Sequence, residues 1–174
     1  MHVKIASILF FSILTLYQFS LPENKAQLGE KLFFDPILSR DSSISCASCH
    51  KPEFAFADSV AISVGVEGKL GRRNAPTVMN IADRSIFFYD GRAKTIHDQV
   101  HFPIQDPVEM DLIYEEAIDR LIKHDYYSKA FLRLYNELPN ADNVADAIVA
   151  FESTLETANT EFDAWMRDKP NSMS

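Results

Sequence analysis

The chain has 174 residues, a formal net charge of −8 and a pI near 5.0. No basic stripe of lysine and arginine accompanies this acidic balance, so the composition argues against nucleic acid as a partner. The two cysteines are too few to form the disulfide framework of a small secreted scaffold.

The first twenty residues predict a secretory signal peptide. Lys4 precedes an apolar run at residues 5–16, and polar sequence begins by Pro22. This run is shorter than the ~20 apolar residues that span a bilayer. An uncleaved membrane anchor is the alternative, because residues 17–20 contain no clean small-x-small cleavage site. Either arrangement places the rest of the chain on the export side, in the periplasm, and leaves residues 21–174 as a single domain with one core.

Apolar residues at helical spacing predict a helix over residues 26–34. Leu28, Leu32 and Phe33 lie on one face of this helix, and Pro36 follows its end. The next stretch, residues 39–45, is polar and predicts a loop that leads to the two cysteines.

Cys46, Cys49 and His50 have the spacing that attaches c-type haem. Two thiols three residues apart can form thioether bonds to the two vinyl groups of one porphyrin, and the next histidine then lies under the iron as an axial ligand. A lone disulfide, a partial zinc site and a thioredoxin-like redox pair are the alternatives. A structural zinc site needs four protein ligands, and a redox pair accompanies a βαβ pattern; the sequence offers neither. The motif therefore predicts one covalently attached haem c.

The middle of the chain has little periodicity. Residues 51–73 contain three glycines and predict a long irregular loop. Loops of this length are uncommon unless they have a task, and wrapping a cofactor is one such task. Residues 74–77 predict a turn, and Pro76 within it is predicted to start a short helix. Residues 95–100 predict one or two helical turns that Pro103 ends.

The C-terminal third predicts three helices, each with one apolar stripe, and a break near His124 separates the first two. The stripes are Leu112, Ala117, Ile118, Leu121 and Ile122; then Tyr127, Phe131, Leu134 and Tyr135; then Val144, Ala147, Ile148, Phe151 and Leu155 within residues 140–157. Strand alternation is nearly absent. The predicted fold class is all-α, with long loops packed around a buried haem.

Ordered sequence blocks give the chain a specific family resemblance. The blocks are Leu28-Gly29-x-x-Leu32-Phe33-Phe34-Asp35, Leu38-Ser39, Ser45-Cys46-Ala47-Ser48-Cys49-His50, Ser63-Val64-Gly65, Arg73-Asn74-Ala75-Pro76-Thr77-Val78-x-Asn80, Asp90-Gly91-Arg92-Ala93 and Pro103-Ile104-x-x-Pro107-x-Glu109-Met110. With these blocks in this order, the chain resembles the N-terminal, peroxidatic domain of bacterial di-haem cytochrome c peroxidases. The resemblance implies a cytochrome c-like helical fold from about residue 28 to residue 165. Because the family's second haem domain has no counterpart here, we expect half of such an enzyme.

The resemblance also implies two residues of a distal pocket. Glu109 matches the family's catalytic glutamate, and Gln99 matches its distal-pocket glutamine. Peroxide reduction needs a group that takes a proton from one peroxide oxygen and delivers it to the other. A carboxylate suits this task when burial raises its pKa toward neutrality. The alternatives are a helix N-terminal acid for Glu109 and a solvated helix residue for Gln99.

Three positions depart from the family pattern or depend on the missing domain. Val66 stands where many members carry the histidine that caps the peroxidatic iron, which implies an open or water-bound iron. Tyr89 replaces a tryptophan, and we expect a buried aromatic residue there, with electron relay as the alternative. Asn74 matches one contributor to the family's interdomain calcium site. The other contributors would come from the second domain, so the support for calcium is weak.

Three functions remain open from the sequence. The first is a peroxidase that reduces hydrogen peroxide with electrons from a small exported cytochrome c or cupredoxin. The second is a monohaem electron-transfer protein, with a methionine such as Met79 or Met110 as sixth ligand. The third is the peroxidatic subunit of a split enzyme whose second haem domain is a separate polypeptide. Val66 favours an open site over the second function.

Overall fold

The computed structural model describes residues 20–82 and 84–167, and the secondary structure within them is helical. In chain order the elements are α1 (Lys25–Phe34), η1 (Pro36–Leu38), α2 (Cys46–Cys49), η2 (Pro52–Phe54), η3 (Val66–Gly68), α3 (Ile96–Gln105), α4 (Tyr114–Lys123), α5 (Asp125–Tyr135), α6 (Ala141–Glu152) and α7 (Glu161–Met166). Three isolated bridges are the only β-type pairings in these ranges. The all-α prediction is confirmed.

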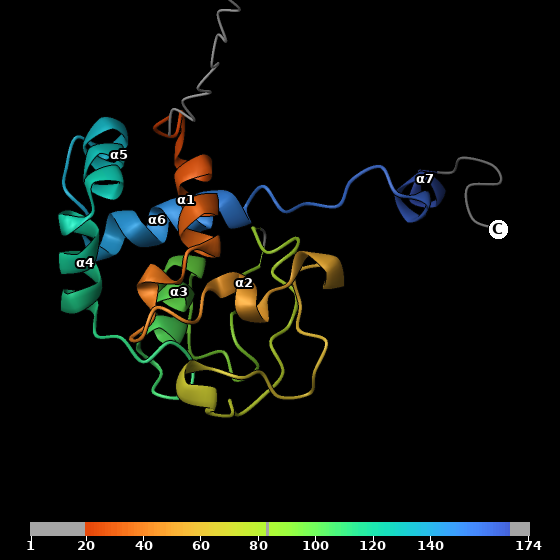
Figure 1. Cartoon of the computed structure of the whole chain (residues 1–174). Coiled ribbons are helices and arrows are strands. Elements are labelled where there is room, and N and C mark those ends of the chain that lie inside the picture. Colours follow the sequence, from red (N-terminus) through yellow and green to blue (C-terminus); the bar gives the residue numbers. More distant parts are fainter. Residues whose placement is uncertain (1–19, 83, 168–174) are drawn as a thin grey trace, which may run out of the picture.

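The molecule has two regions of different character (Figure 1). The helical frame consists of α1, α3, α4, α5 and α6, which gather on one side. The loop region, residues 39–95, is mostly irregular and carries α2, η2 and η3. The short α7 lies apart from the other helices, at the end of an extended segment. Within the described chain, every helix is too short or too polar to cross a membrane. The signal peptide predicted for residues 1–20 lies outside the described residues except for Ser20.

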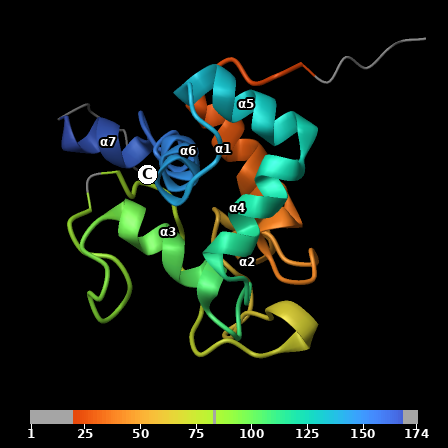
Figure 2. The same cartoon turned by 90° about the vertical axis from the view of Figure 1, so that its left-hand side faces the viewer.

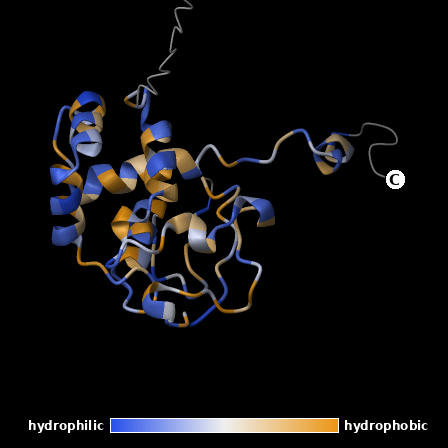
Figure 3. Ribbon diagram, viewed as in Figure 1, coloured by the Kyte–Doolittle hydropathy of each residue, from blue (hydrophilic) through white to orange (hydrophobic). Residues whose placement is uncertain are grey.

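Close packing of α1 on α6 organises the helical frame (Figure 2). Leu28, Leu32 and Phe33 of α1 are fully buried there. Gly29 allows the two helices to cross closely, because a Cβ at this position would overlap the carbonyl of Ala147. The same face of α6 supplies the predicted stripe, and hydropathy colouring shows apolar residues between the helices and polar residues outside (Figure 3). The stripe residues of α1 and α6 are therefore buried as their spacing predicts, whereas Leu155 of the predicted stripe follows the end of α6. In the stripe predicted for α4, Leu112 precedes the helix and Ile122 is exposed.

Polar contacts attach α4 and α5 to the segment that follows α1. The hydroxyl of Tyr127 on α5 is buried and donates to Asp35 Oδ2 at 2.7 Å. On α4, the guanidinium of Arg120 donates to the carbonyls of Ser39 at 2.6 Å and Arg40 at 2.7 Å. These contacts satisfy backbone carbonyls that no helix or sheet would pair. They fix the start of the loop region on the helical frame.

Two predicted helix ends are wrong. α3 continues through Pro103 to Gln105, because proline removes only its own donor and the next turn still closes through Asp106 N and Phe102 O at 2.9 Å. α6 ends at Glu152, five residues before the predicted end. After it the Thr154 hydroxyl donates to the carbonyl of Phe151 at 2.7 Å, which competes with continuing the helix.

The helix predicted to begin at Pro76 is also wrong. Residues 76–78 are irregular and lead into a turn. The Pro76 carbonyl accepts a contact from His50, and the Thr77 hydroxyl donates to the Ala55 carbonyl at 2.6 Å. This backbone therefore pairs with the segment after α2 instead of with itself. The irregular loop predicted for residues 51–73 is confirmed apart from the two short turns η2 and η3.

Candidate haem site

α2 carries both cysteines and is followed at once by His50. Cys46 and Cys49 are its first and last residues, and neither thiol is in a disulfide. The N–H of Ser45 donates to Ser48 Oγ at 3.0 Å, and the N–H of His50 donates to the Cys46 carbonyl at 2.9 Å. Residues three apart on a helical turn project from the same side. The two thiols therefore lie on one side of α2, next to the imidazole.

Two backbone carbonyls fix the ring of His50. Its Nδ1 lies 3.1 Å from the Phe56 oxygen and 3.0 Å from the Pro76 oxygen. Carbonyl oxygens only accept, so Nδ1 carries the proton and Nε2 keeps its lone pair. Burial lowers the pKa of His50, which keeps the imidazole neutral near neutral pH. A neutral imidazole held through its other nitrogen is the usual form of a histidine that ligates a metal.

An aromatic wall stands beside this histidine. The ring of Phe33 on α1 lies 6.3 Å from the ring of His50, 6.1 Å from Phe56 and 5.1 Å from Phe151, measured between centroids. Apolar surroundings raise the pKa of the Cys46 thiol to about 12. Free thiols, an oriented imidazole and an aromatic wall together fit covalent haem c: the two thiols would bind the vinyl groups, and His50 would ligate the iron through Nε2.

Two buried polar atoms near Cys46 were missed by sequence reasoning. Tyr114 OH and Glu152 Oε2 are buried and have no hydrogen-bond partner within the described chain. Burial raises the pKa of Glu152 to about 8, so this acid is mainly protonated at neutral pH. Its position was visible in the sequence, because it follows Ile148 by four residues on the apolar stripe of α6. An acidic residue on an apolar stripe could therefore have indicated a buried carboxyl group from the sequence.

Glu109 lies in a turn after α3, residues 106–111, here called the Glu109 turn. Its side chain is half-buried, and its pKa is raised mainly by burial and further by the negative charge of Asp106. The N–H of Val66 donates to the Glu109 carbonyl at 2.9 Å. Gly65 permits this approach, because a Cβ there would overlap the carbonyls of Val108 and Glu109. The structure thus brings Val66, fully buried in η3, directly against the Glu109 turn.

Gln99 lies on α3 and is half-buried. The Pro103 carbonyl accepts from the N–H of Met110 at 3.1 Å, which ties the end of α3 to the Glu109 turn. Among the described residues, no hydrogen bond joins the side chains of Gln99 and Glu109. The structure therefore places both on one continuous segment, and their meeting over a shared ligand remains a prediction.

Tyr89 corrects one expectation. Its side chain is 95% exposed, whereas a buried aromatic residue was predicted. The reason is the tight turn around it: Phe88 and Gly91 have positive φ values of 61° and 68°, which point residue 89 outward. The Arg73 guanidinium lies 5.5 Å from the centre of the ring. Asn74 donates to the Val60 carbonyl at 2.6 Å, so its side-chain N–H already has a partner in the loop region.

Residues 23–171 match the family model of the di-haem cytochrome c peroxidases. The chain is 40% identical over 151 residues to cytochrome c peroxidase Ccp of Escherichia coli, covering 86% of this chain and 32% of that protein. It is 36% identical over 156 residues to cytochrome c551 peroxidase of Nitrosomonas europaea, covering 88% of this chain and 47% of that protein.

Solved structures give the same picture. A MauG-like protein associated with microbial copper homeostasis superposes with a TM-score of 0.74 at 27% identity, covering 86% of this chain and 45% of that one. The diheme peroxidase BthA from Burkholderia thailandensis superposes with a TM-score of 0.73 at 25% identity, covering 87% of this chain and 44% of that one. The chain therefore spans less than half the length of each of these proteins.

Proposed function

Because this chain belongs to the di-haem cytochrome c peroxidase family, we propose that it is a peroxidase domain that holds one haem c and reduces hydrogen peroxide to water. Cys46 and Cys49 are the attachment points, and His50 is the axial ligand of the iron. The electrons come from a small exported redox protein, a cytochrome c or a cupredoxin. The observation that carries the proposal is the fixed His50 ring, whose Nδ1 contacts two carbonyls and leaves Nε2 free beside two unpaired thiols.

Glu109 and Gln99, the two residues predicted for the distal pocket, would have distinct tasks. Bound haem would supply the iron at which one peroxide, two electrons and two protons give two waters. The Glu109 carboxylate takes a proton from one peroxide oxygen and delivers it to the other, which then leaves as water. Burial supports this role, since it raises the pKa of Glu109 toward the pH at which both forms are populated. Gln99 orients the peroxide through its amide.

Val66 bears on whether peroxide can reach the iron directly. Its side chain has no lone pair, so it cannot ligate iron, and η3 holds it fully buried against the Glu109 turn. The sixth position of the iron would then be empty or hold a displaceable water. Of the two methionines considered as a sixth ligand, Met110 is packed in the hydrophobic core and Met79 is half-buried.

A second candidate is a peroxidatic subunit that works with a second haem domain on another polypeptide. Its support is a set of exposed apolar side chains on the loop region: Leu70 and Ile86, each 66% exposed, and Tyr89. Mixing the haem-loaded chain with a candidate second domain distinguishes the two, because only the subunit needs that domain for turnover.

We also propose that the chain is exported to the periplasm, either with a cleaved signal peptide or through an N-terminal anchor. The apolar run at residues 5–16 supports this, and so does the haem motif, since thioether attachment takes place on the export side. Sequencing the N-terminus of the periplasmic protein tests the proposal.

The peroxidase proposal is tested with Glu109→Gln, which keeps size and polarity but cannot exchange a proton. We expect turnover with peroxide to fall by ~10²–10⁴ while the haem spectrum stays unchanged. Glu115→Gln, an exposed acid on α4, is the matched control and should keep full turnover. Wild-type turnover in the Glu109→Gln protein would exclude this residue as the proton carrier.

A further inference from the structure

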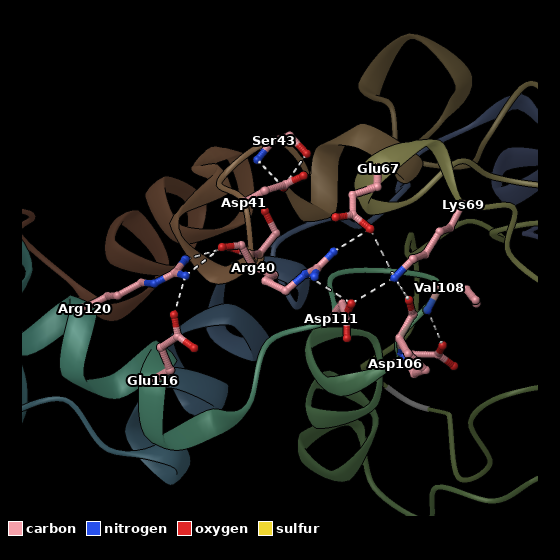
Figure 4. Close-up of polar contacts among 12 residues, drawn as sticks. Arg40, Asp41, Ser43, Glu67, Lys69, Asp106, Val108, Asp111, Glu116 and Arg120 are labelled. Atoms are coloured by element: carbon pink, nitrogen blue, oxygen red, sulfur yellow. Dashed lines mark hydrogen bonds and ion pairs between the residues drawn. The ribbon is translucent and has the colours of Figure 1, made fainter.

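A cluster of four charged side chains lies where η3 meets the Glu109 turn (Figure 4). Arg40 contacts Glu67 Oε2 at 2.7 Å and Asp111 Oδ2 at 3.2 Å. Lys69 contacts the same two oxygens at 3.5 Å and 3.1 Å, and also donates to the Pro107 carbonyl at 3.1 Å. Each cation therefore bridges one acid from each segment.

Both acids have a strained backbone. Glu67 has a φ of 55° and Asp111 a φ of 52°, in the left-handed region that favours glycine. Residues with side chains persist there when the surrounding structure holds them, and such sites gather around functional pockets. Here the contacts that hold the two acids include the four-membered cluster and the backbone hydrogen bond from the Val66 N–H to the Glu109 carbonyl.

Arg40 is itself held firmly on the helical frame. Its N–H donates to the Met110 carbonyl at 2.8 Å, and its own carbonyl accepts from Arg120 of α4 at 2.7 Å (Figure 4). The cluster thus connects three separate parts of the chain: α4, η3 and the Glu109 turn. An isolated exposed ion pair stabilises little, whereas a network with anchored members and a fixed geometry contributes more.

We propose that Arg40 and Lys69 are positioning residues: with Glu67 and Asp111 they form an ion-pair lock that holds η3 closed on the Glu109 turn. The lock keeps Val66 buried and fixes where the Glu109 carboxyl lies. This inference rests on the proposed peroxidase function for the role of Glu109, but the lock itself can be measured without any turnover.

The test uses the haem-loaded ferric protein and hydrogen exchange of the Val66 amide, the group that bonds to Glu109. Glu67→Gln combined with Asp111→Asn removes both acids of the lock. The matched control, Asp119→Asn combined with Asp125→Asn, removes two acids that pair with Lys123 and Lys129 on exposed faces of α4 and α5. Both double variants change the net charge equally.

We expect exchange of the Val66 amide to accelerate by about fivefold or more in the lock variant and to stay unchanged in the control. Unchanged exchange in the lock variant, or equal acceleration in both, overturns the lock. If the lock variant does not fold, the wild-type protein is measured with and without added salt. Salt screens the ion pairs of the lock, so it should accelerate hydrogen exchange of the Val66 amide more than that of the Phe131 amide, which belongs to a buried residue of α5. Equal salt responses of the two amides overturn the lock as well.

The positioning role has its own readout, the pH profile of the reaction with peroxide. An open turn hydrates Glu109 and lowers its pKa. The other charged groups that act on this pKa are Asp106, which raises it, and Arg92 and Arg72, which lower it. The acid limb of the profile should therefore shift to lower pH in the lock variant alone. A turn that opens without this shift overturns the positioning role. A wild type without peroxide turnover refutes the proposed function, and the exchange result still decides whether the lock exists.

Discussion

The helical frame and the loop region are stabilised in different ways. In the frame, buried apolar faces meet across helices, as where Leu28 and Leu32 of α1 pack on α6. In the loop region, long irregular segments are joined by single polar contacts, such as those of His50 with two carbonyls. The frame is therefore stabilised mainly by buried apolar side chains, whereas the loop region carries the two cysteines and His50. Perturbations of the two should therefore have separable effects.

The largest expected effect lies in the loop region. Cys46→Ala combined with Cys49→Ala should abolish covalent haem, so that denaturation in acid releases all of it from the protein. His50→Ala is the informative partner, because it should keep haem attached and lose the native spectrum. A gel stained for covalent haem checks both variants. Haem that stays bound to the double-alanine variant after denaturation contradicts the attachment site.

Next in size is a substitution in the helical frame. Gly29→Ala raises helix propensity, yet its Cβ would overlap the Ala147 carbonyl. The cost of pushing α1 away from α6 should exceed the gain in helix propensity. We expect the free energy of unfolding, measured with urea, to fall by about 3 kcal/mol. Glu30→Ala, on the exposed side of the same helix, should be close to neutral. A stabilised Gly29→Ala protein would mean that the helices do not cross as closely as described.

The stability of the folded protein should depend on pH through Glu152, which lies at the end of α6, where the helical frame ends. Its pKa is raised from 4.5 to about 8 in the folded protein, mainly by burial. Between these values the folded state binds more protons than the unfolded state, so stability falls as pH rises. Glu152→Gln should remove this fall and be more stable than wild type at pH 6 by about 2 kcal/mol, but not at pH 4. Urea unfolding of the haem-loaded proteins at the two pH values measures it; parallel curves would contradict the buried acid.

The smallest expected effect concerns the joint between α5 and the end of α1. Tyr127→Phe removes the hydroxyl that donates to Asp35, and should cost about 1 kcal/mol. Tyr89→Phe serves as control. This side chain is almost fully exposed, so loss of its hydroxyl should leave the stability unchanged. Thermal unfolding of the two variants gives the comparison. Equal stability of both would show that the joint does not depend on this bond.

Sequence periodicity predicted the helical frame well because its stability comes from apolar stripes, which are local patterns. The haem motif and the irregular loop could also be identified from the sequence, because both are local patterns. The failures have two kinds of cause: contacts distant in sequence, and local turns that hydrophobic periodicity does not encode. Pro76 turns toward His50 instead of starting a helix, and Tyr89 is turned outward by its neighbours. The Arg40 cluster joins residues up to 71 positions apart, so no local pattern announces it.

The central claim is an accessible iron above His50, with Val66 in place of a ligand and Glu109 beside it. Rapid mixing of the ferric, haem-loaded protein with hydrogen peroxide tests it most directly. We expect a high-spin spectrum before mixing and a fast reaction without prior reduction. Val66→His should drive the spectrum toward low spin and slow the reaction. A wild-type protein that is already low-spin and does not react with peroxide would contradict the claim.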